Sequence, residues 1–372
     1  MTARLDSSAC PTPFWLPGGH LQTIYSAFCT RHQRIAFVRQ RAETADGDFI
    51  DFDWAAPGLF PERLHSGALA KTELQLRHTA ARRWGTSADW QQLPHEPHTR
   101  ALLLLHGLEG SSKSHYAQAI AQYFRARGWV VVIAHFRGCS GFPNRMARAY
   151  YSGDSADIEF MLHTVREKLP QAQWYAIGVS MGGNALLKHL GEQGEHIRWL
   201  QGCAVISAPL DLVACGEQIS NSLTGRYLYC PHFLRSMKAK ILAKTHRYPG
   251  LVDFMRLNQA RTLRDFDDLY TAPMHGYQNA HDYWRQCSAR PLLKDIQVPT
   301  LILNALNDPF IPAYSLPQPR ECSAAILLHQ PKTGGHVGFT TGHFPGHFQW
   351  LPQRIAHFFQ TERSQLNSLS DN

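Results

Sequence analysis

A glycine-flanked serine is the first candidate for chemistry in this sequence. Gly178-Val179-Ser180-Met181-Gly182 begins within the end of the apolar run WYAIGV (174–179) and leads into a helical pattern over 181–192. In a nucleophile elbow, flanking glycines leave room for a strained serine whose Oγ projects above a sheet. The five-residue motif alone is weak evidence, but its place between a predicted strand and a predicted helix favours a nucleophile over an inert turn serine.

A serine that attacks a carbonyl needs backbone donors for the negative charge on the oxygen. The first predicted donor is the Met181 N–H, directly after the serine, and the second should come from the loop after an earlier strand. That loop is LLLLHGLEGSS (102–112), where Gly107 lets the backbone turn, so the second predicted donor is the Leu108 N–H. His106 is expected to brace this loop rather than to titrate, because the base of such a site follows the serine in the chain.

An acid and a histidine follow in the required order. Asp308 comes after the apolar run TLILN (300–304), and His336 comes after AAILLH (324–329). Loops at the carboxyl edge of a parallel sheet face the ligand, so both side chains should lie there. We therefore predict that Asp308 orients the imidazole, and that His336 deprotonates Ser180 and later activates water.

Other carboxylates have simpler roles. Asp211 is the rival acid, since a triad acid can follow an alternative strand, but it is also placed to cap the next helix. Asp154 and Asp157 precede a helical pattern and are interpreted as a cap and a first-turn charge.

A metal site is a further hypothesis, raised by His336, His343 and His347. Pro345 and Gly346 break the helix that would bring the last two onto one face, and no thiolate or carboxylate accompanies them at ligand spacing. The eight cysteines include no C-x-x-C pair, so we expect them to be reduced. The sequence predicts neither a metal nor a cofactor.

The elements that must position these residues alternate in type. Buried strands are predicted at 101–105, 129–134, 174–179 and 202–207, with helices between them over 112–127, 155–169 and 181–192. This rhythm predicts a doubly wound α/β domain with a mostly parallel sheet. Strands resume at 300–304 and 324–329, and a last helix is expected over 349–360.

About eighty residues interrupt the rhythm without a convincing strand. The segment 211–290 holds helical stretches such as 233–245 and 279–288 and is predicted to be a helical lid. Its aromatic side chains could line an acyl pocket, although a small lid also needs a core of its own. They are Tyr227, Tyr229, Phe233, Phe254, Phe266, Tyr270, Tyr277, Tyr283 and Trp284.

The remaining boundaries follow from turns and polar stretches. A β-hairpin is predicted from 34–40 and 49–55, joined around Asp46-Gly47. The expected division is an N-terminal extension (1–33), a core (34–210 and 291–362), the lid, and a disordered tail (363–372). Within the core, 59–98 is expected to be a polar, strandless insertion. Pro13–Ile24 is expected to follow a fixed, non-helical path over the domain.

Composition excludes several classes of protein. Hydrophobic residues make up 44% and charged residues 18% of 372 residues, which is typical of a globular protein. No secretory signal or membrane-spanning run is recognised, so a cytoplasmic location is expected. Lys and Arg are dispersed despite the net charge of +8, which argues against a nucleic-acid partner and leaves a weak peripheral contact with anionic lipid open. The oligomeric state is not predicted.

Six motifs together resemble the YheT-like branch of α/β-hydrolases, also called AB hydrolase family 4. They are FWLPGGHLQTI (14–24), HGLEGSS (106–112), HFRGCSGFPNR (135–145), GVSMGGN (178–184), NDPFIP (307–312) and GGHVGF (335–340). The resemblance covers 13–359 and implies an α/β-hydrolase fold and a serine esterase with Ser180, Asp308 and His336 as its triad. Relatives in animals act on lipids. Two departures are Tyr150-Tyr151-Ser152-Gly153, where the family usually has Tyr-His-Ser-Gly, and a longer 59–98 segment.

The leading hypothesis is hydrolysis of medium-chain or lipid-like carboxylic esters through an acyl-serine intermediate. An acyltransferase would use the same residues and differ in which acceptor enters during deacylation. A hydrolase fold retained as a non-catalytic binding module is the third hypothesis, although such proteins usually lose a triad member and this chain keeps all three.

Overall fold

The computed structural model describes residues 3–29, 35–59, 82–363 and 366. Within them, no helix combines the length and the apolar character needed to cross a bilayer.

The described residues form one ten-stranded sheet with the order β1-β10-β9-β8-β7-β5-β6-β3-β2-β4. Neighbouring strands are parallel except in the pairs β2/β3 and β3/β6, because β3 runs in the opposite direction to both of its neighbours. The strands are β1 (Arg4–Asp6), β2 (Phe37–Glu43), β3 (Phe49–Ala55), β4 (Arg82–Trp84), β5 (Arg100–Leu105), β6 (Val130–Ala134), β7 (Gln173–Val179), β8 (Gly202–Ile206), β9 (Thr300–Leu303) and β10 (Ile326–His329). The predicted sheet and hairpin are therefore confirmed.

The central strands end level with one another. Leu105 pairs with Gly178, and Val179 pairs with Ile206 on the next strand. Ile206 in turn lies opposite Leu303, which lies opposite His329. The loops that follow β5, β7, β9 and β10 consequently leave the sheet at the same edge, which is where the sequence placed its candidate residues.

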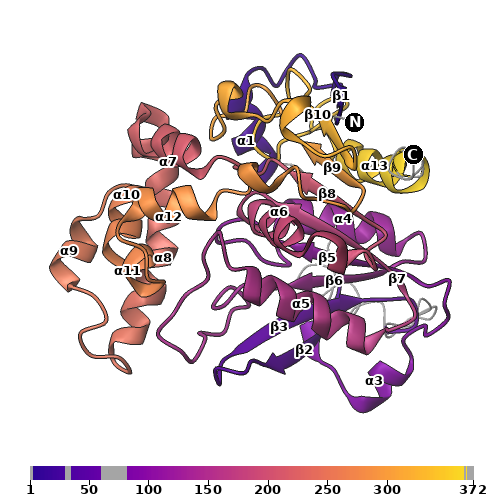
Figure 1. The fold of residues 1–372 in the computed structure, drawn as a ribbon, viewed down its shortest axis with the longest axis horizontal. Coiled ribbons are helices and arrows are strands. Elements are labelled where there is room, and N and C mark those ends of the chain that lie inside the picture. Colours follow the sequence, from indigo (N-terminus) through magenta and orange to yellow (C-terminus); the bar gives the residue numbers. More distant parts are fainter. Residues whose placement is uncertain (1–2, 30–34, 60–81, 364–365, 367–372) are drawn as a thin grey trace.

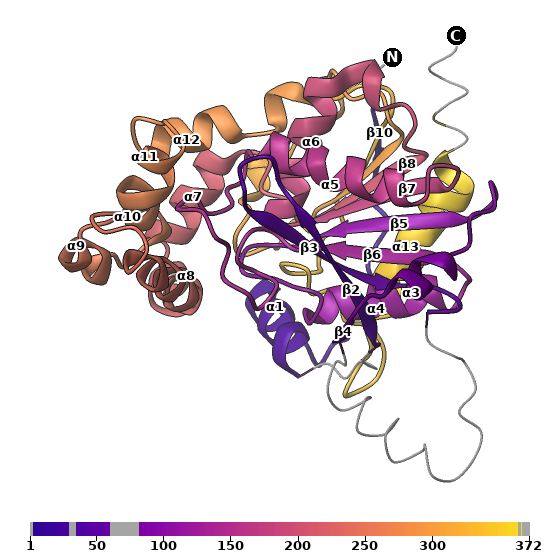
Figure 2. The same cartoon turned by 90° about the horizontal axis from the view of Figure 1, so that it is seen from below.

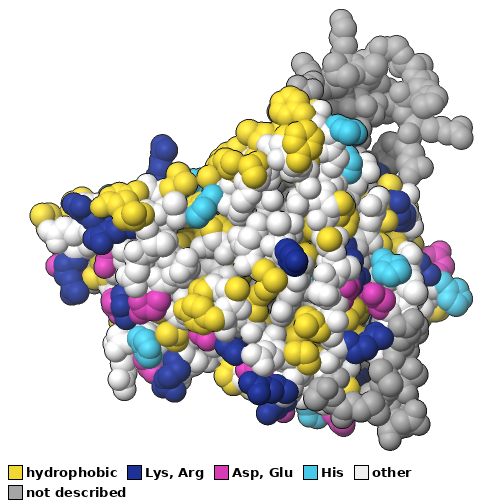
Figure 3. Space-filling view, turned by 90° about the horizontal axis from the view of Figure 1, so that it is seen from above, with side chains coloured by type: hydrophobic (Ala, Val, Ile, Leu, Met, Phe, Trp, Pro, Cys, Tyr) yellow, Lys and Arg dark blue, Asp and Glu magenta, His cyan; other side chains and the backbone are white. Residues whose placement is uncertain are grey.

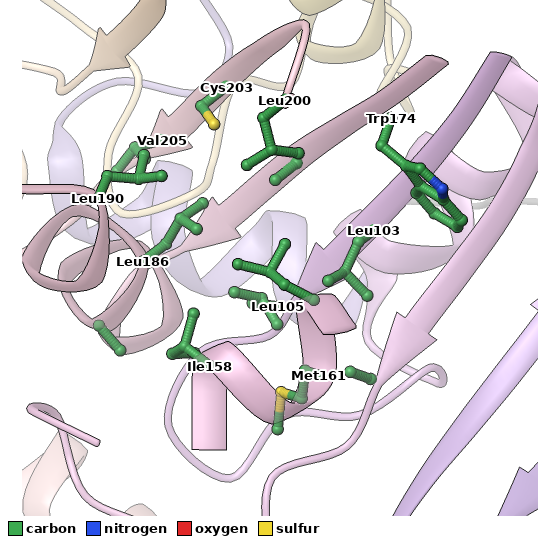
Figure 4. Packing of buried hydrophobic residues seen from close by; sticks show 14 of the residues in the cluster. Leu103, Leu105, Ile158, Met161, Trp174, Leu186, Leu190, Leu200, Cys203 and Val205 are labelled. Carbon is green, nitrogen blue, oxygen red and sulfur yellow. The ribbon is translucent and has the colours of Figure 1, made fainter. Parts of the chain in front are cut away.

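Helices cover both faces of the sheet (Figures 1 and 2). One face carries α5 (Ser155–Lys168) and α6 (Met181–Gln193), and the other carries α4 (His115–Arg125) and α13 (Trp350–His357), followed by a π-helical turn (Phe358–Glu362). Figure 4 shows Ile158, Met161 and Leu186 directed from α5 and α6 toward Leu103 and Val205 of the strands. This apolar layer fixes α6, the helix that begins directly after Ser180.

The segment 211–290 is helical and contains none of the ten strands. Figure 1 shows it to one side of the sheet, with the elements α7 (Leu212–Asn221), a π-helix (Gly225–Tyr229), α8 (Cys230–Thr245), α9 (Phe254–Gln259), α10 (Leu263–Phe266), a second π-helix (Asp267–Thr271), α11 (Ala272–Met274) and α12 (Ala280–Cys287). Tyr229, Phe266 and Tyr270 pack into an apolar cluster of this segment's own, whereas Tyr227 and Phe254 are exposed. We call this helical insertion the cap.

Two expectations were wrong. The 59–98 segment is not strandless, because β4 pairs in parallel with β2 and is followed by α3 (Ser87–Gln91). Thr86 and Asp89 form a capping box at the start of α3. This local signal for a helix was missed because the segment as a whole is polar. Residues 60–81 of the predicted insertion lie outside the described residues.

Pro13–Ile24 is not wholly non-helical, since α1 spans Gly19–Phe28. The helix begins directly after Gly18, whose φ of 75° suits a residue without a side chain. β1, still nearer the N-terminus, pairs with β10 at the edge of the sheet, so the N-terminal segment is joined to the C-terminal part of the core.

Short 3-10 helices complete the core at Gly194–Ile197, Arg290–Leu292, Ala313–Ser315 and Pro319–Glu321. On the surface in Figure 3, basic side chains lie scattered among acidic and apolar ones rather than in a stripe. This distribution gives no electrostatic footprint of a nucleic-acid site on that face.

Candidate active site

Ser180 lies in a strained turn between β7 and α6. Its φ of 52° and ψ of −122° are unfavourable for a residue with a Cβ, and its N–H donates to the Ile206 carbonyl over 2.8 Å. Glycines provide the clearance: a Cβ on Gly178 would approach Gly183 Cα to 2.6 Å, and one on Gly182 would approach the His106 carbonyl oxygen to 2.5 Å. This is the geometry expected of a nucleophile elbow.

A chain of hydrogen bonds connects Ser180 to the predicted histidine and acid. Ser180 Oγ lies 2.9 Å from His336 Nε2, and His336 Nδ1 lies 2.8 Å from Asp308 Oδ2. A carboxylate only accepts, so Nδ1–H donates to Asp308 and leaves Nε2 to accept from the serine hydroxyl. The backbone N–H of Phe310 donates to the other oxygen of Asp308, which fixes the carboxylate.

The N-terminal helix α1 supports the histidine loop, a role that the sequence did not reveal. The His336 N–H donates to Thr23 Oγ1 over 2.9 Å. Gln22 Oε1 accepts from Asn307 Nδ2 and from the Gly334 N–H, both over 3.0 Å. Thus α1 contacts the loops that carry both Asp308 and His336.

Ser207, after β8, is a second residue that sequence reasoning missed. Its Oγ accepts from the Val337 N–H over 3.0 Å, on the residue after His336. Both Ser207 and Val337 have positive φ, at 49° and 54°. The only sequence signal was the position of Ser207 at a strand end.

The loop after β5 forms a tight turn beside Ser180. The Gly107 carbonyl accepts from the Gly110 N–H over 2.9 Å, and Glu109, the third residue of this turn, has a φ of 56°. The Gly107 N–H donates to Tyr116 Oη and the Glu109 N–H to Tyr150 Oη. Among the described residues these bonds occupy every amide of the turn except that of Leu108.

Met181 supplies the other predicted donor. It is the first residue of α6, and the first N–H groups of a helix have no partner within that helix. Leu108, Met181 and Ser180 all line the same cavity, together with His336.

His106 braces the turn, as expected. Its Nε2 accepts from the Phe136 N–H over 3.2 Å, and its Nδ1 lies 2.8 Å from the Gly107 carbonyl oxygen. Burial, together with the neighbouring His135, lowers the pKa of His106 to about 3. The ring is therefore neutral near pH 7.

The rival carboxylates serve other purposes. Asp211 caps α7 by accepting from the Ala214 N–H, and Asp154 caps α5 by accepting from the Asp157 N–H. Burial and the nearby Asp157 raise the pKa of Asp154 to about 6. Among the described residues, no group of three or more potential ligands could hold a metal ion.

A cavity of about 620 Å³ lies between the sheet edge and the cap. Its core wall includes Ser180, Leu108 and His336, and its cap wall is largely apolar and aromatic. The cap residues include Leu212, Ile219, Tyr229, Phe233, Met237, Ile241, Phe266, Tyr270, Tyr283 and Trp284. The predicted acyl-pocket residues Tyr227 and Phe254 are exposed.

Comparison with known proteins gives matches along most of the chain. A family model described as the alpha/beta hydrolase fold matches residues 100–342. The YheT protein of Escherichia coli (strain K12) is 34% identical over 92% of this chain and 90% of its own length. The phospholipase ABHD3 of Homo sapiens is 27% identical over 96% of this chain and 80% of its own.

A monoacylglycerol lipase of Saccharomyces cerevisiae is 28% identical over 87% of this chain and 74% of its own. Among solved structures, the esterase Pf2001 of Pyrococcus furiosus matches with a TM-score of 0.51 and 14% identity, over 87% of this chain and 90% of that chain. At this identity the structural match speaks for the fold alone.

Proposed function

The chain belongs to the α/β-hydrolase family, in its YheT-like branch, and is a carboxylic ester hydrolase; we propose that it cleaves medium-chain or lipid-like acyl esters through an acyl-serine intermediate. Ser180 is the nucleophile, His336 the base and Asp308 the residue that orients it. The observation that carries this proposal is the hydrogen-bonded series from Ser180 Oγ through His336 to Asp308, with separations of 2.9 Å and 2.8 Å.

The reaction follows from the positions of these groups. His336 Nε2 takes the proton of Ser180 as Oγ forms a bond to the ester carbonyl carbon. The oxyanion is stabilised by the N–H groups of Leu108 and Met181. When the tetrahedral intermediate collapses, the carbon–oxygen bond to the alcohol breaks and His336 returns the proton to the departing alcohol. Water, deprotonated by the same imidazole, then releases the acid and restores Ser180.

The cap supports the choice of substrate class. We propose that 211–290 acts as a lid whose apolar inner wall holds the acyl chain beside Ser180. A cavity of about 620 Å³ has room for a chain longer than acetyl. The phospholipase and monoacylglycerol lipase among the relatives are named for lipid esters, which supports the same choice.

The proposal is tested with a fluorophosphonate probe and a series of p-nitrophenyl esters. We expect stoichiometric labelling at Ser180, loss of labelling and of hydrolysis in Ser180→Ala, and kcat/KM that rises from acetyl to medium-length chains. Ser207→Ala is not a suitable control because Ser207 contacts the histidine loop. Ser236→Ala, on cap helix α8, is a better one because the Ser236 hydroxyl donates to the Phe233 carbonyl within that helix. Absence of labelling on folded protein would contradict the mechanism, and a preference for acetyl esters would contradict the substrate class.

A further inference from the structure

A cap side chain contacts the turn that carries Leu108. Lys240, on α8, donates from Nζ to Glu109 Oε1 over 2.8 Å and lies 3.2 Å from Cys139 Sγ. Glu109 directly follows Leu108, and the two ion-pair partners are 131 positions apart in the chain. The pair therefore joins the cap to the core at the edge of the proposed oxyanion site.

Glu109 needs such support because of its backbone. Its φ of 56° lies in the left-handed region, at the turn position where glycine is favoured. Tyr150 Oη both accepts from the Glu109 N–H over 3.0 Å and donates to Glu109 Oε1 over 2.7 Å. Tyr150, from the core, and Lys240, from the cap, consequently donate to the same carboxylate oxygen.

The pair has the burial and charge of a persistent contact. The Glu109 side chain is only 10% exposed, and that of Lys240 is 32% exposed. Burial by itself would lower the pKa of Lys240, but Cys139 and Glu109 raise it above its usual value, so the ammonium stays charged. An ion pair shielded in this way is stronger than one on the open surface.

Other polar cap contacts meet a different part of the core. Lys244 Nζ donates to the carbonyls of Ala147 and Arg148, and Tyr270 Oη also donates to Ala147. These bonds hold the cap on the loop before α5, whereas among the described residues the hydrogen bond from the cap to the turn at 107–110 comes from Lys240. The position of α8 can thus affect that turn through the Lys240 side chain.

We propose that Lys240 is a positioning residue that, through Glu109, holds the Leu108 N–H where the developing oxyanion requires it. The inference rests on the proposed function. Both side chains line the cavity, but the contact acts on the Leu108 amide, which binds the oxyanion of the transition state, so its loss lowers kcat while KM stays nearly unchanged. It also couples the cap to catalysis, since displacement of α8 releases the turn.

The test is a set of variants assayed on the wild type's best ester. Lys240→Met and Glu109→Gln should each lower kcat about tenfold, less than the loss of a whole oxyanion donor, with KM within about twofold. The double variant should be no worse than either single one, because the two residues act as a pair. Lys240→Arg should retain most of the activity. Lys238→Met is the matched control, as Lys238 lies on the same helix but donates to Asn258 and Ala260 inside the cap.

Inhibition by a trifluoromethyl ketone, whose adduct with serine carries an oxyanion, provides the second readout. Its affinity should fall in parallel with kcat in Lys240→Met and Glu109→Gln. An unchanged kcat in both, an effect confined to KM, or additive losses in the double variant would overturn the inference. A wild-type protein that hydrolyses no ester would instead contradict the proposed function, so the two failures are distinguishable.

Discussion

Asp308 is the residue whose assignment depends most on geometry. Two carboxylates, Asp308 and Asp211, follow strands of the core at places where a triad acid could lie. Of these two, Asp308 is hydrogen-bonded to His336, whereas Asp211 accepts from the Ala214 N–H of α7. The separation of their roles makes a direct comparison possible.

Asp308→Asn should lower kcat by about 10³- to 10⁴-fold, because an amide facing Nδ1 favours the wrong imidazole tautomer for accepting the Ser180 proton. Asp211→Asn should change kcat less than about twofold, since an asparagine also caps a helix. Steady-state kinetics on one ester measure both. A larger loss in Asp211→Asn than in Asp308→Asn would reverse the assignment.

At the residue scale, the sequence predicted which side chains would lie together where the local pattern and the chain order agreed. Ser180, Asp308 and His336 each follow a run that reads as a buried strand, and parallel strands bring such ends to one edge. Thr23 and Ser207 could not be found in this way, because their roles arise from contacts with residues 313 and 130 positions away.

At the scale of elements, α1 is the clearest case of a part whose function lies outside itself. Gly19 begins this helix, and a Cβ there would fall 1.8 Å from the Asn307 carbonyl oxygen, next to Asp308. Because of this close approach, α1 packs directly against the loops that carry Asp308 and His336.

Gly19→Ala should therefore push α1 away from the Asp308 loop and lower kcat at least about tenfold, while the fold is retained because the sheet is not touched. Activity and far-ultraviolet circular dichroism are the measurements. Leu21→Ala is the control on the same helix, since Leu21 is 53% exposed. Equal activity of Gly19→Ala and wild type would show that α1 does not position the relay.

The β2–β3 hairpin is tied to the same region by a buried ion pair. Arg39 donates from Nε and Nη2 to Asp53 over 2.7 and 2.8 Å, and Ser112, beyond the turn at 107–110, also donates to Asp53. Although burial opposes it, His135 and Arg39 hold the pKa of Asp53 well below its usual range. Stability from Asp53 is present above the usual aspartate pKa and is lost as pH falls below it.

Arg39→Met should destabilise the fold by about 3 kcal/mol, because it removes two hydrogen bonds and a positive charge from the buried Asp53 carboxylate. Arg198→Met should cost less than about 1 kcal/mol, since Arg198 and its partner Glu195 are both mostly exposed. Urea unfolding at pH 7 measures both. Similar values for the two variants would argue against a special role for the Arg39–Asp53 pair.

The elements that were missed are short or depend on distant partners. β1 and β4 have three residues each, too few for a period-two pattern, and they exist because β10 and β2 offer edges to pair with. Glycines and prolines around 13–19 concealed α1, whose packing against the loops of Asp308 and His336 no local pattern encodes. By contrast, the long strands were predicted because each is a continuous apolar run, typical of a parallel sheet covered on both faces, and α5 because its buried residues recur at helical spacing.

At the scale of the whole molecule, the cap and core enclose the cavity that the sequence could only suggest. The cap has an apolar core of its own and also forms a wall of the cavity. Most of its aromatic residues therefore stabilise the cap itself, besides any contact with substrate. That wall also carries charged side chains, among them Lys240, Lys244 and Asp267. Asp267, in the second π-helix, lines the cavity and accepts from Trp284 Nε1 over 2.9 Å.

Burial raises the pKa of Asp267 to about 6, from an ordinary value of 3.8. The folded state therefore favours the protonated carboxyl, so stability is lost as pH rises from about 4 to about 6 and stays lost above that. Asp267→Asn keeps an acceptor for Trp284 without the charge, and should stabilise the protein by about 2 kcal/mol at pH 7.5 and by much less at pH 4. Urea unfolding at the two pH values measures this difference. Asp295→Asn, at an exposed position, is the control. An equal effect of Asp267→Asn at both pH values would mean that the carboxyl is not the destabilising charge.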